Sequence, residues 1–472
     1  MGRLIRACLS LALLLLVPLG IAAAQEPQEG YKLLWSYDTG NNSVEYVSVS
    51  ADGSYVAALS GFKVYLFSRE GKFLWSKGSR DITGADSFVS PLSGLSISRD
   101  GSYIAVATPV FTYSNGYPAE FVAEKVYLFN QDGKLLWSHE VGNTRVVAYP
   151  VKVSVSPDGS FVVVGAHAQD TKDSDVYSKV LLFNRGGELL WDYKVDRVIY
   201  GVSISSDSSY IGAASSDTAA YFFNQEGELL WSYKTEEVSY AVSLSTDGSF
   251  IAACSVEKVY FLNRKGELLW SCEGDGASIS SDGSYVVVED GGKVCFFNRE
   301  GNLLWNYEMG EYEHTRTVSL SSDGCYTVVG CGGPQEAGTS RIYFFNYEGK
   351  LLCSHETNGW VQRVSMSSDG YYVAACCWEG DVYFFMSPLV LALDIDQDGV
   401  PNDKDFAPTI NNTYIYVGAT AFVLVGVISA SARTIVRRRR KCLVEERIEE
   451  EKNKIIKAID KELGTNADKH RE

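Results

Sequence analysis

The chain has 472 residues, of which 42 are Lys or Arg and 59 are Asp or Glu, so its formal net charge is −17. Hydrophobic residues make up 46% of it, which is too many for a disordered chain and enough for a sizeable core. The excess of acidic residues argues against a nucleic-acid partner, because the phosphate backbone attracts basic surfaces. We therefore expect a folded acidic protein that does not bind nucleic acid.

The first residues have the pattern of an export signal. Arg3 and Arg6 precede a long apolar run, and three alanines stand directly before Gln25. A basic start, an apolar stretch and small residues at the end are typical of a signal peptide. We assign residues 1–24 to this signal and leave them out of the fold.

From residue 31 to residue 386 the chain repeats one pattern eight times. One recurring segment, of the type "GELLWSY", centres on Trp35, Trp75, Trp137, Trp191, Trp231, Trp270, Trp305 and, in degenerate form, Cys353. A second segment, of the type "SxDGSY", has its acid at Asp52, Asp100, Asp158, Asp207, Asp247, Asp282, Asp323 and Asp369. Self-similarity of this kind indicates a repeat architecture.

Each repeat contains four short apolar runs that are rich in Val, Ile, Tyr, Phe and Trp, which predicts four strands. The "SxDG" and "NxxG" segments between them supply the Asp and Gly that tight turns require. Four-stranded antiparallel sheets arranged around an axis form a β-propeller, so the sequence predicts an all-β, eight-bladed propeller over residues 31–386. We expect the repeated tryptophans to pack between neighbouring blades.

The two ends of the repeat region complement each other. The first copy consists only of Leu33–Tyr37, with no earlier strands, and the last copy has three strands with no "LLW" segment after them. We predict that the N-terminal strand completes blade eight and closes the ring, because closure removes two exposed sheet edges.

Two stretches carry a family resemblance. "VSPDGSFVVVG" (residues 155–165) and "VYLFNQDGKLLWSH" (residues 126–139) resemble the WD40-like repeat and the pyrroloquinoline-quinone-like (PQQ-like) repeat. The second family includes non-enzymatic surface and scaffold proteins, so the resemblance implies the fold and leaves the function open.

An enzyme is the main alternative to a binding module, because quinone-dependent alcohol dehydrogenases resemble this chain in having eight blades. Those enzymes stack PQQ on a vicinal disulfide, and Cys376 and Cys377 are adjacent here. We expect this pair to lie in a strand, however, and the sequence has no "CxxCH" haem site and no cluster among its 5 His. We therefore predict a non-enzymatic module without PQQ, with a quinoprotein or a structural surface-layer component as alternatives.

Between the propeller and the C-terminus, "DIDQDGVPNDKDF" (residues 394–406) has the spacing of a calcium loop. It resembles thrombospondin type-3 and dockerin-type repeats. We expect a structural Ca²⁺ ion in an acidic stalk over residues 387–412, with ligands from Asp394, Asp396, Asp398, the Val400 carbonyl, Asn402 and Asp405. The alternative is a solvated acidic linker.

The C-terminal region predicts one membrane span. Tyr414–Ala432 contains no charged residue and is long enough to cross a bilayer, so we place a transmembrane helix at residues 413–433. The basic cluster from Arg437 to Lys441 marks the following side as cytoplasmic. This predicts a single-pass protein of the cell membrane with an extracellular propeller and a cytoplasmic basic and amphipathic tail, residues 434–472. Eight cysteines between Cys254 and Cys377 are then exported, either as disulfides or as buried thiols.

In a propeller, the loops between second and third strands lie on the same face as the connections between blades. The longest inserted segments, in blades one to three and seven, all belong to that face. Long loops on a rigid scaffold usually carry function, so we expect this face to bind an extracellular protein or glycan. The predicted contacts are the aromatic residues Phe111, Tyr113, Tyr117 and Phe121 and the acidic residues Asp170, Asp173 and Asp175. The alternative is that these aromatic side chains fold back onto the blade edge.

Overall fold

The computed structural model describes the repeat region, from residue 31 to residue 387, with several gaps. The described residues are 31–40, 43–61, 63–78, 81, 87–89, 94–114, 117–142, 152–169, 176–310, 312–333 and 340–387. The predicted signal peptide, calcium loop, membrane span and tail lie outside them. Within the described residues, no helix is long and apolar enough to span a membrane.

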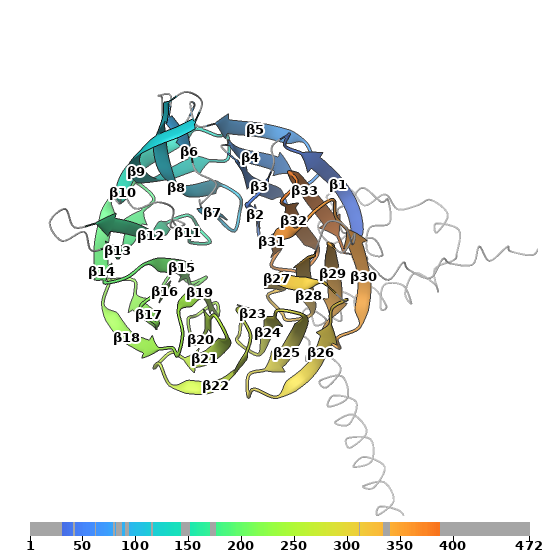
Figure 1. Ribbon diagram of the computed structural model, residues 1–472. Coiled ribbons are helices and arrows are strands. Elements are labelled where there is room, and N and C mark those ends of the chain that lie inside the picture. The colour runs from blue at the N-terminus through green and yellow to red at the C-terminus, as the bar shows by residue number, and fades with distance from the viewer. Residues whose placement is uncertain are drawn as a thin grey trace, which may run out of the picture.

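Eight antiparallel sheets stand around a central axis and form a closed ring, which confirms the predicted eight-bladed propeller (Figure 1). In each blade the first strand lies nearest the axis and the fourth lies outermost. The strands of blades one to four are β2 (Tyr46–Val49), β3 (Tyr55–Ser60), β4 (Lys63–Ser68) and β5 (Phe73–Gly78); β7 (Gly94–Ile97), β8 (Tyr103–Ser114), β9 (Tyr117–Asn130) and β10 (Leu135–Gly142); β11 (Lys152–Val155), β12 (Phe161–Gln169), β13 (Val176–Asn184) and β14 (Leu189–Val195); and β15 (Ile199–Ile204), β16 (Tyr210–Ser215), β17 (Ala219–Asn224) and β18 (Leu229–Lys234).

The remaining four blades follow the same order along the chain. Their strands are β19 (Ser239–Leu244), β20 (Phe250–Ser255), β21 (Lys258–Asn263) and β22 (Leu268–Glu273); β23 (Gly276–Ile279), β24 (Tyr285–Asp290), β25 (Lys293–Asn298) and β26 (Leu303–Glu308); β27 (His314–Leu320), β28 (Tyr326–Gly332), β29 (Arg341–Asn346) and β30 (Leu351–Glu356); and β31 (Val361–Met366), β32 (Tyr372–Cys377), β33 (Asp381–Met386) and, from the N-terminus, β1 (Lys32–Asp38).

The repeated tryptophan joins each blade to the next one. In seven blades the indole N–H donates a hydrogen bond of 2.7–2.9 Å to a backbone carbonyl in the "NxxG" turn of the following blade. The turn glycine has φ between 76° and 87°, and a Cβ on it would come within 2.5–2.8 Å of that indole. Only glycine fits both the left-handed backbone and the close contact. The prediction that the tryptophans pack between blades is confirmed.

Ring closure follows the predicted route. The strand β1 pairs antiparallel with β33, and its Trp35 donates to the Arg69 carbonyl of blade one, as the other tryptophans do. The indole of Trp35 lies between Phe384 of its own blade and Phe67 of the next, with ring centroids 5.2 and 5.3 Å away. The non-covalent joint, which is the contact between blades eight and one, therefore has the same structure as the contacts between blades that follow each other in the chain.

The degenerate eighth copy has a physical reason. Blade eight receives its fourth strand from the N-terminus, so it has no "NxxG" turn against which a tryptophan of blade seven could pack. Tyr31 fills that place: its ring stacks on Phe344 at 4.4 Å and its hydroxyl donates to the Gly370 carbonyl at 2.5 Å. The Tyr31 N–H points at the sulfur of Cys353 at 3.1 Å. A small residue at position 353 leaves room for this tyrosine.

A second set of contacts links the blades near the axis. In most "SxDG" turns, the backbone N–H of the residue before the aspartate donates to the carbonyl of the equivalent residue in the next blade; in blade four the N–H of Asp207 itself donates to the Thr246 carbonyl at 3.0 Å. Ala51 donates to Arg99 at 2.8 Å, and Ser368 of blade eight donates back to Ala51 at 2.9 Å. The series is interrupted after Pro157, because proline has no N–H. This backbone ring closes the propeller a second time, close to its axis.

The outer strands are protected against pairing with other chains. In blades one to eight the register between third and fourth strands shifts at the "LLW" segment, as between Phe296 and Phe297 in blade six. Such bulges twist an edge strand and interrupt its hydrogen-bonding pattern. Leu303 and Leu304 of this edge are each 48% exposed without forming a regular pairing surface.

Blade two departs from the expected four strands. Residues in the inserted segment form β6 (Ser87–Val89), which pairs with the far part of β8 beyond the blade. The segment from Pro109 to Glu124, which we expected to be a loop, continues β8 and β9 as a long hairpin (Figure 1). The insertion keeps the alternating β-rich composition of its blade, so the ladder continues outward instead of ending.

Packing explains most of the cysteines in the repeat region. Free thiols are found at Cys254, Cys272, Cys295, Cys331, Cys353, Cys376 and Cys377. Burial raises the pKa of the Cys254 and Cys376 thiols far above the ordinary value, so both stay protonated. All seven are free thiols rather than disulfides; five of them are buried, whereas Cys272 and Cys353 are partly exposed.

We predict that Tyr31 and Cys353 are energetically coupled. Cys353→Trp alone should destabilise the protein by roughly 1–3 kcal/mol, because the indole and the Tyr31 ring compete for the face of Phe344. In a Tyr31→Ala background the same change should cost at least about 1 kcal/mol less, since the indole then has room. Urea unfolding of the four proteins measures the coupling.

Leu303→Ala serves as the control partner, because this leucine is exposed and lies on another blade. Its effect should add to that of Tyr31→Ala within about 0.5 kcal/mol. Additive effects for the Tyr31 and Cys353 pair as well would contradict the packing explanation.

Candidate functional site

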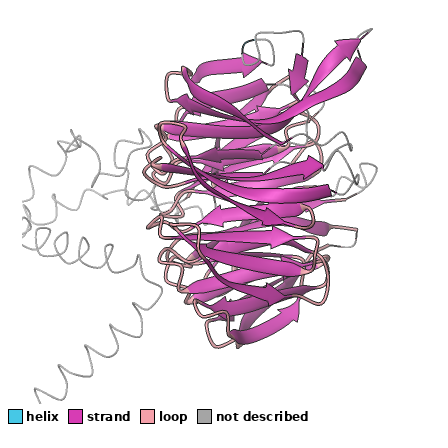
Figure 2. Ribbon diagram, turned by 90° about the vertical axis from the view of Figure 1, so that its left-hand side faces the viewer, coloured by secondary structure: helices cyan, strands magenta, loops and turns pink. Residues whose placement is uncertain are grey.

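The ring has two unlike faces, which Figure 2 shows in side view. The turn face consists of the "SxDG" and "NxxG" turns. The hairpin face carries the connections between blades and the hairpins between second and third strands. On the hairpin face β8 and β9 are 12 and 14 residues long and β12 and β13 are 9 residues each, whereas β20 and β21 are 6 residues each. The elaboration is therefore confined to one face, as the sequence predicted.

The four predicted aromatic contacts lie on the extension of the β8–β9 hairpin. Phe111 is paired with Phe121, Tyr113 with Pro118, and Tyr117 with Ser114, and the register shifts twice in this stretch. The hairpin thus brings positions that are up to ten residues apart to the same outer end. The structure confirms that these four positions come together along the backbone.

The other predicted site residues lie outside the described part of the chain. Asp170, Asp173 and Asp175 fall between β12 and β13, and Asp394, Asp396, Asp398, Val400, Asn402 and Asp405 follow the last described residue. Among the described residues, no group of three or more His, Cys, Asp or Glu side chains is arranged to hold a metal ion. The calcium loop stays a prediction.

A buried pair of hydrogen-bonded side chains, Glu124 and His167, supports the base of the hairpin face. Glu124 of β9 is 2% exposed and His167 of β12 is 0% exposed, so the pair joins blades two and three. The Glu124 carboxylate accepts from the His167 backbone N–H at 2.6 Å and lies 3.0 Å from its Nδ1. The Nε2 atom faces the Ile199 carbonyl of blade four at 3.2 Å. Both ring nitrogens thus have a polar partner, one in blade two and one in blade four, and the imidazole ties three blades together.

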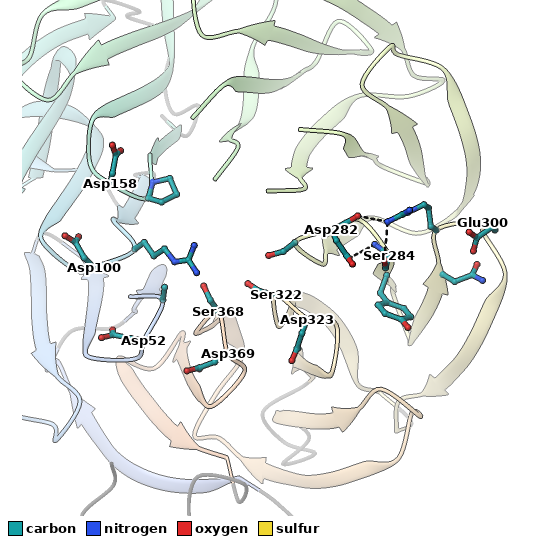
Figure 3. A pocket seen from close by; sticks show the side chains of 17 residues that line it. Asp52, Asp100, Asp158, Asp282, Ser284, Glu300, Ser322, Asp323, Ser368 and Asp369 are labelled. Atoms are coloured by element: carbon teal, nitrogen blue, oxygen red, sulfur yellow. Dashed lines mark hydrogen bonds between the residues drawn. The ribbon is translucent and has the colours of Figure 1, made fainter. Parts of the chain in front are cut away.

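At the turn face, the central channel opens into a cavity of about 1080 Å³ (Figure 3). Its wall contains the turn aspartates Asp52, Asp100, Asp158, Asp282, Asp323 and Asp369. A ring of carboxylates around an opening could bind a cation. Whether these groups are available for a cation depends on the hydrogen bonds that they already accept.

The carboxylates of this ring are already engaged within their own turns. Asp52 accepts from the Ser54 N–H at 3.0 Å, the Ser54 hydroxyl at 2.7 Å and the Ser50 hydroxyl at 2.9 Å. Burial alone would raise the pKa of Asp52, but these hydrogen bonds outweigh it and hold the pKa below its ordinary value. In blade seven Cys325 replaces the second serine, and there burial dominates and raises the pKa of Asp323. The ring stabilises turns, and we assign it no chemistry.

Arginines brace the same face. Arg264 of the "NxxG" turn in blade five donates to the Asp247 carbonyl at 2.6 Å, and its guanidinium lies 4.8 Å from the ring centre of Tyr210 in the preceding blade. Arg69, Arg185 and Arg299 make the equivalent contacts in their blades. The turn face is therefore a structural surface.

The opposite mouth of the channel has a different character. Two adjoining cavities of about 350 and 170 Å³ share Lys152, Arg363, Tyr200, Tyr240 and Ala241 in their walls. We call this region the cationic mouth, which consists of Lys152, Arg316, Arg363, Tyr46, Tyr200, Tyr240, Asp275 and Glu289. These residues come mainly from the starts of first strands, and therefore lie at the hairpin-face end of the channel.

Cations and aromatic rings are in contact in this mouth. The Lys152 ammonium donates to the Tyr46 hydroxyl at 2.6 Å, and the Arg363 guanidinium lies 5.3 Å from the centre of the same ring. Burial alone would raise the pKa of Tyr46, but the two positive charges outweigh it and lower the pKa. Arg363 lines both cavities, and its side chain is exposed to the channel. Its charge therefore faces the channel.

Glu289 is the unusual member of the cationic mouth. It lies on β24 opposite Gly276 of β23, and a Cβ on this glycine would come within 2.0 Å of the Glu289 Oε1 atom. The side chain is 8% exposed, and its Oε2 atom has no hydrogen-bond partner among the described residues. Burial, followed by the charge of Asp275, raises the pKa of Glu289 to about 8. The carboxyl group is thus largely protonated at neutral pH.

Glu289 of the cationic mouth departs from the repeat pattern in the sequence. The slot of Glu289 on the second strand is filled in the other blades by Leu59, Ala107, Gly165, Ala214, Cys254, Gly330 and Cys376. Glu289 is thus an acidic residue at a repeat position that otherwise holds small or apolar residues. Residues that break a local rule often mark functional positions.

The radial sheets, the closing N-terminal strand and the channel define an eight-bladed β-propeller built from PQQ-like repeats. Residues 122–397 match the PQQ_2 family, whose description is outer membrane protein assembly factor BamB. This is more than half of the chain, so the protein belongs to that family. A search of curated proteins found no match.

We predict that the buried pair at the base of the hairpin face is required for stability. Glu124→Gln should destabilise the protein by about 1–3 kcal/mol, because it replaces one of the two buried carboxyl oxygens that face the His167 backbone N–H and Nδ1 by an amide nitrogen. Chemical unfolding with and without the substitution measures the loss. Lys125→Gln is the matched control next to it, since the pair of Lys125 with Glu140 is at the surface and should contribute less than about 1 kcal/mol. Equal effects of both substitutions would contradict the argument.

We also predict a pH dependence from Glu289. Its folded-state pKa lies above the ordinary value of 4.5, so its stabilising contribution is complete below pH 4.5 and is lost as the pH rises through about 8. Glu289→Gln removes this titration, and the melting temperature of the variant relative to the natural protein should therefore increase between pH 4.5 and pH 8. A constant difference across this range would show that the group titrates normally.

Proposed function

We propose that this protein is a membrane-anchored binding or scaffold module that engages an extracellular protein or glycan through its hairpin face. The observation that supports this most directly is the unequal elaboration of the two faces. The turn face consists of short turns closed by their own hydrogen bonds, whereas the β8–β9 hairpin extends beyond its blade and gains β6 as a third strand. A rigid ring that presents one elaborated face suits partner binding. The description of its family as an assembly factor is in keeping with a scaffold role.

A quinoprotein enzyme is the second candidate, and the cysteine pair argues against it. Cys376 and Cys377 occupy successive positions in β32, and each is 0% exposed. Cys376 packs in the layer between blades eight and one, whereas Cys377 packs in the layer between blades seven and eight. Successive strand residues point to opposite sheet faces, an arrangement that disfavours a vicinal disulfide.

The anchoring elements complete the proposal. The strand β33 ends on the turn face, where the Ser387 N–H donates to the Tyr371 carbonyl at 2.7 Å. We propose that the stalk over residues 387–412 leaves from this face, binds one Ca²⁺ ion and connects to a membrane span at residues 413–433. In that orientation the hairpin face points away from the membrane and is available to a partner.

We predict that partner capture depends on the β8–β9 extension. A membrane-impermeant cross-linker is applied to intact cells, and the cross-linked propeller is purified. Replacing residues 110–122 by a short Gly-Ser link should abolish the captured species, because it removes Phe111, Tyr113, Tyr117 and Phe121. No labelling of the propeller in either protein would contradict its exported position.

The matched control changes the turn face. Glu226, Lys265 and Glu300 are exposed in three "NxxG" turns, and their joint replacement by serine should leave capture intact. Equal capture by the hairpin variant and the natural protein, with both folded, would overturn the assignment of the binding face.

We predict that the acidic stalk binds calcium. Titration of the full chain with Ca²⁺ by calorimetry should give one site, and Asp396→Ala with Asp398→Ala should remove it, because the two carboxylates are central ligands of such a loop. Identical titrations of the natural and substituted proteins would exclude this site.

A further inference from the structure

The cationic mouth is independent of the hairpin extension and is unexplained by partner binding or by the fold. It contains three cations, Lys152, Arg316 and Arg363, in a protein whose net charge is −17. The three come from first strands of different blades, or directly beside them, and converge only because the ring closes. Bringing like charges together in one cavity is unfavourable by itself, so this arrangement requires a reason.

Among the described residues, the two carboxyl groups of the mouth form no salt bridge with these cations. The Glu289 Oε2 and Asp275 Oδ1 atoms are buried and have no hydrogen-bond partner among the described residues. A buried polar atom without a partner costs free energy, and ligand sites are where such costs are accepted. Because Gly276 has no side chain, the Glu289 carboxyl group can reach the cavity wall past the first strand.

The aromatic side chains limit the kind of ligand. Tyr200 and Tyr240 line both cavities, and Tyr46 lines the smaller one, where its ring is held between Lys152 and Arg363. Rings beside polar groups suit a compact molecule that has both apolar and hydroxyl-bearing surfaces. The volume of about 350 Å³ is large enough for a single sugar ring and too small for a folded peptide element.

We propose that the cationic mouth binds a sugar acid, a monosaccharide-sized ligand with one carboxylate. Arg363 and Lys152 contact the carboxylate, since guanidinium and ammonium groups are the strongest side-chain partners of that group. Asp275 accepts from ligand hydroxyl groups, and Glu289, in its protonated form, donates to a ligand oxygen. The ligand then supplies the partners that the buried carboxyl oxygens lack.

The proposal is tested by calorimetry on the full-length protein in detergent, with sodium glucuronate as the probe and glucose as its neutral counterpart. We expect glucuronate to bind and glucose to bind at least tenfold more weakly. Lys152→Gln and Arg363→Gln should each weaken glucuronate binding at least tenfold, whereas Lys265→Gln, which changes an exposed lysine of the turn face, should leave it unchanged. Where Arg363→Gln does not fold, Arg363→Lys keeps the charge and should retain measurable binding.

Glu289 provides a second readout. Glu289→Gln keeps a hydrogen-bond donor and should retain binding, whereas Glu289→Leu should weaken it at least tenfold. The proposal would be overturned if glucuronate gave no heat of binding or if glucose bound with equal affinity. It would also be overturned if inorganic phosphate or PQQ bound more tightly than glucuronate. The same loss of glucuronate affinity in Lys265→Gln as in Lys152→Gln would overturn it as well. The variant without residues 110–122 should bind glucuronate normally, so the outcome is separate from that of the partner-capture experiment.

Discussion

The contact between a tryptophan and the turn of the next blade is the interaction on which the ring depends. A blade is a small sheet with two apolar faces, and it is stable only when both are covered. The indole covers the phenylalanine of its own blade, packs on the glycine of the next blade and donates a hydrogen bond to that turn. One residue therefore fixes the distance and the angle between neighbouring blades, and its repetition determines the curvature of the ring.

The exception at Cys353 shows how strictly this contact is tied to the turn. The final blade lacks the turn because the chain leaves after β33, and there the indole is absent as well. Tyr31, directly before β1, fills the space and supplies its own hydrogen bond to Gly370. The N-terminal segment thus contributes both a strand and a replacement side chain to the non-covalent joint. Pairing with β1 covers β33, which would otherwise be an unpaired edge of blade eight.

The same repeat produces two faces with different roles. On the turn face, the turn aspartates and four of the arginines stabilise the turns, and a cavity of about 1080 Å³ lies among them. On the hairpin face the blades are allowed to differ, both in hairpin length and in the residues at the starts of the first strands. The two smaller cavities are therefore lined by residues that depart from the repeat, such as Glu289, whereas the larger cavity is lined by the repeated turn aspartates.

The repeat pattern by itself determined the fold class, the number of blades, the position of the tryptophans and the closing strand, because these follow from local periodicity and from the unpaired first and last copies. It also located the aromatic residues of the β8–β9 extension on one face. Only the tertiary structure decided the rest. Lys152, Arg363 and Glu289 are far apart in sequence and meet because eight blades close around one axis. Glu124 and His167 form a pair because blades two and three stand side by side. Such contacts depend on ring geometry, which no single repeat contains.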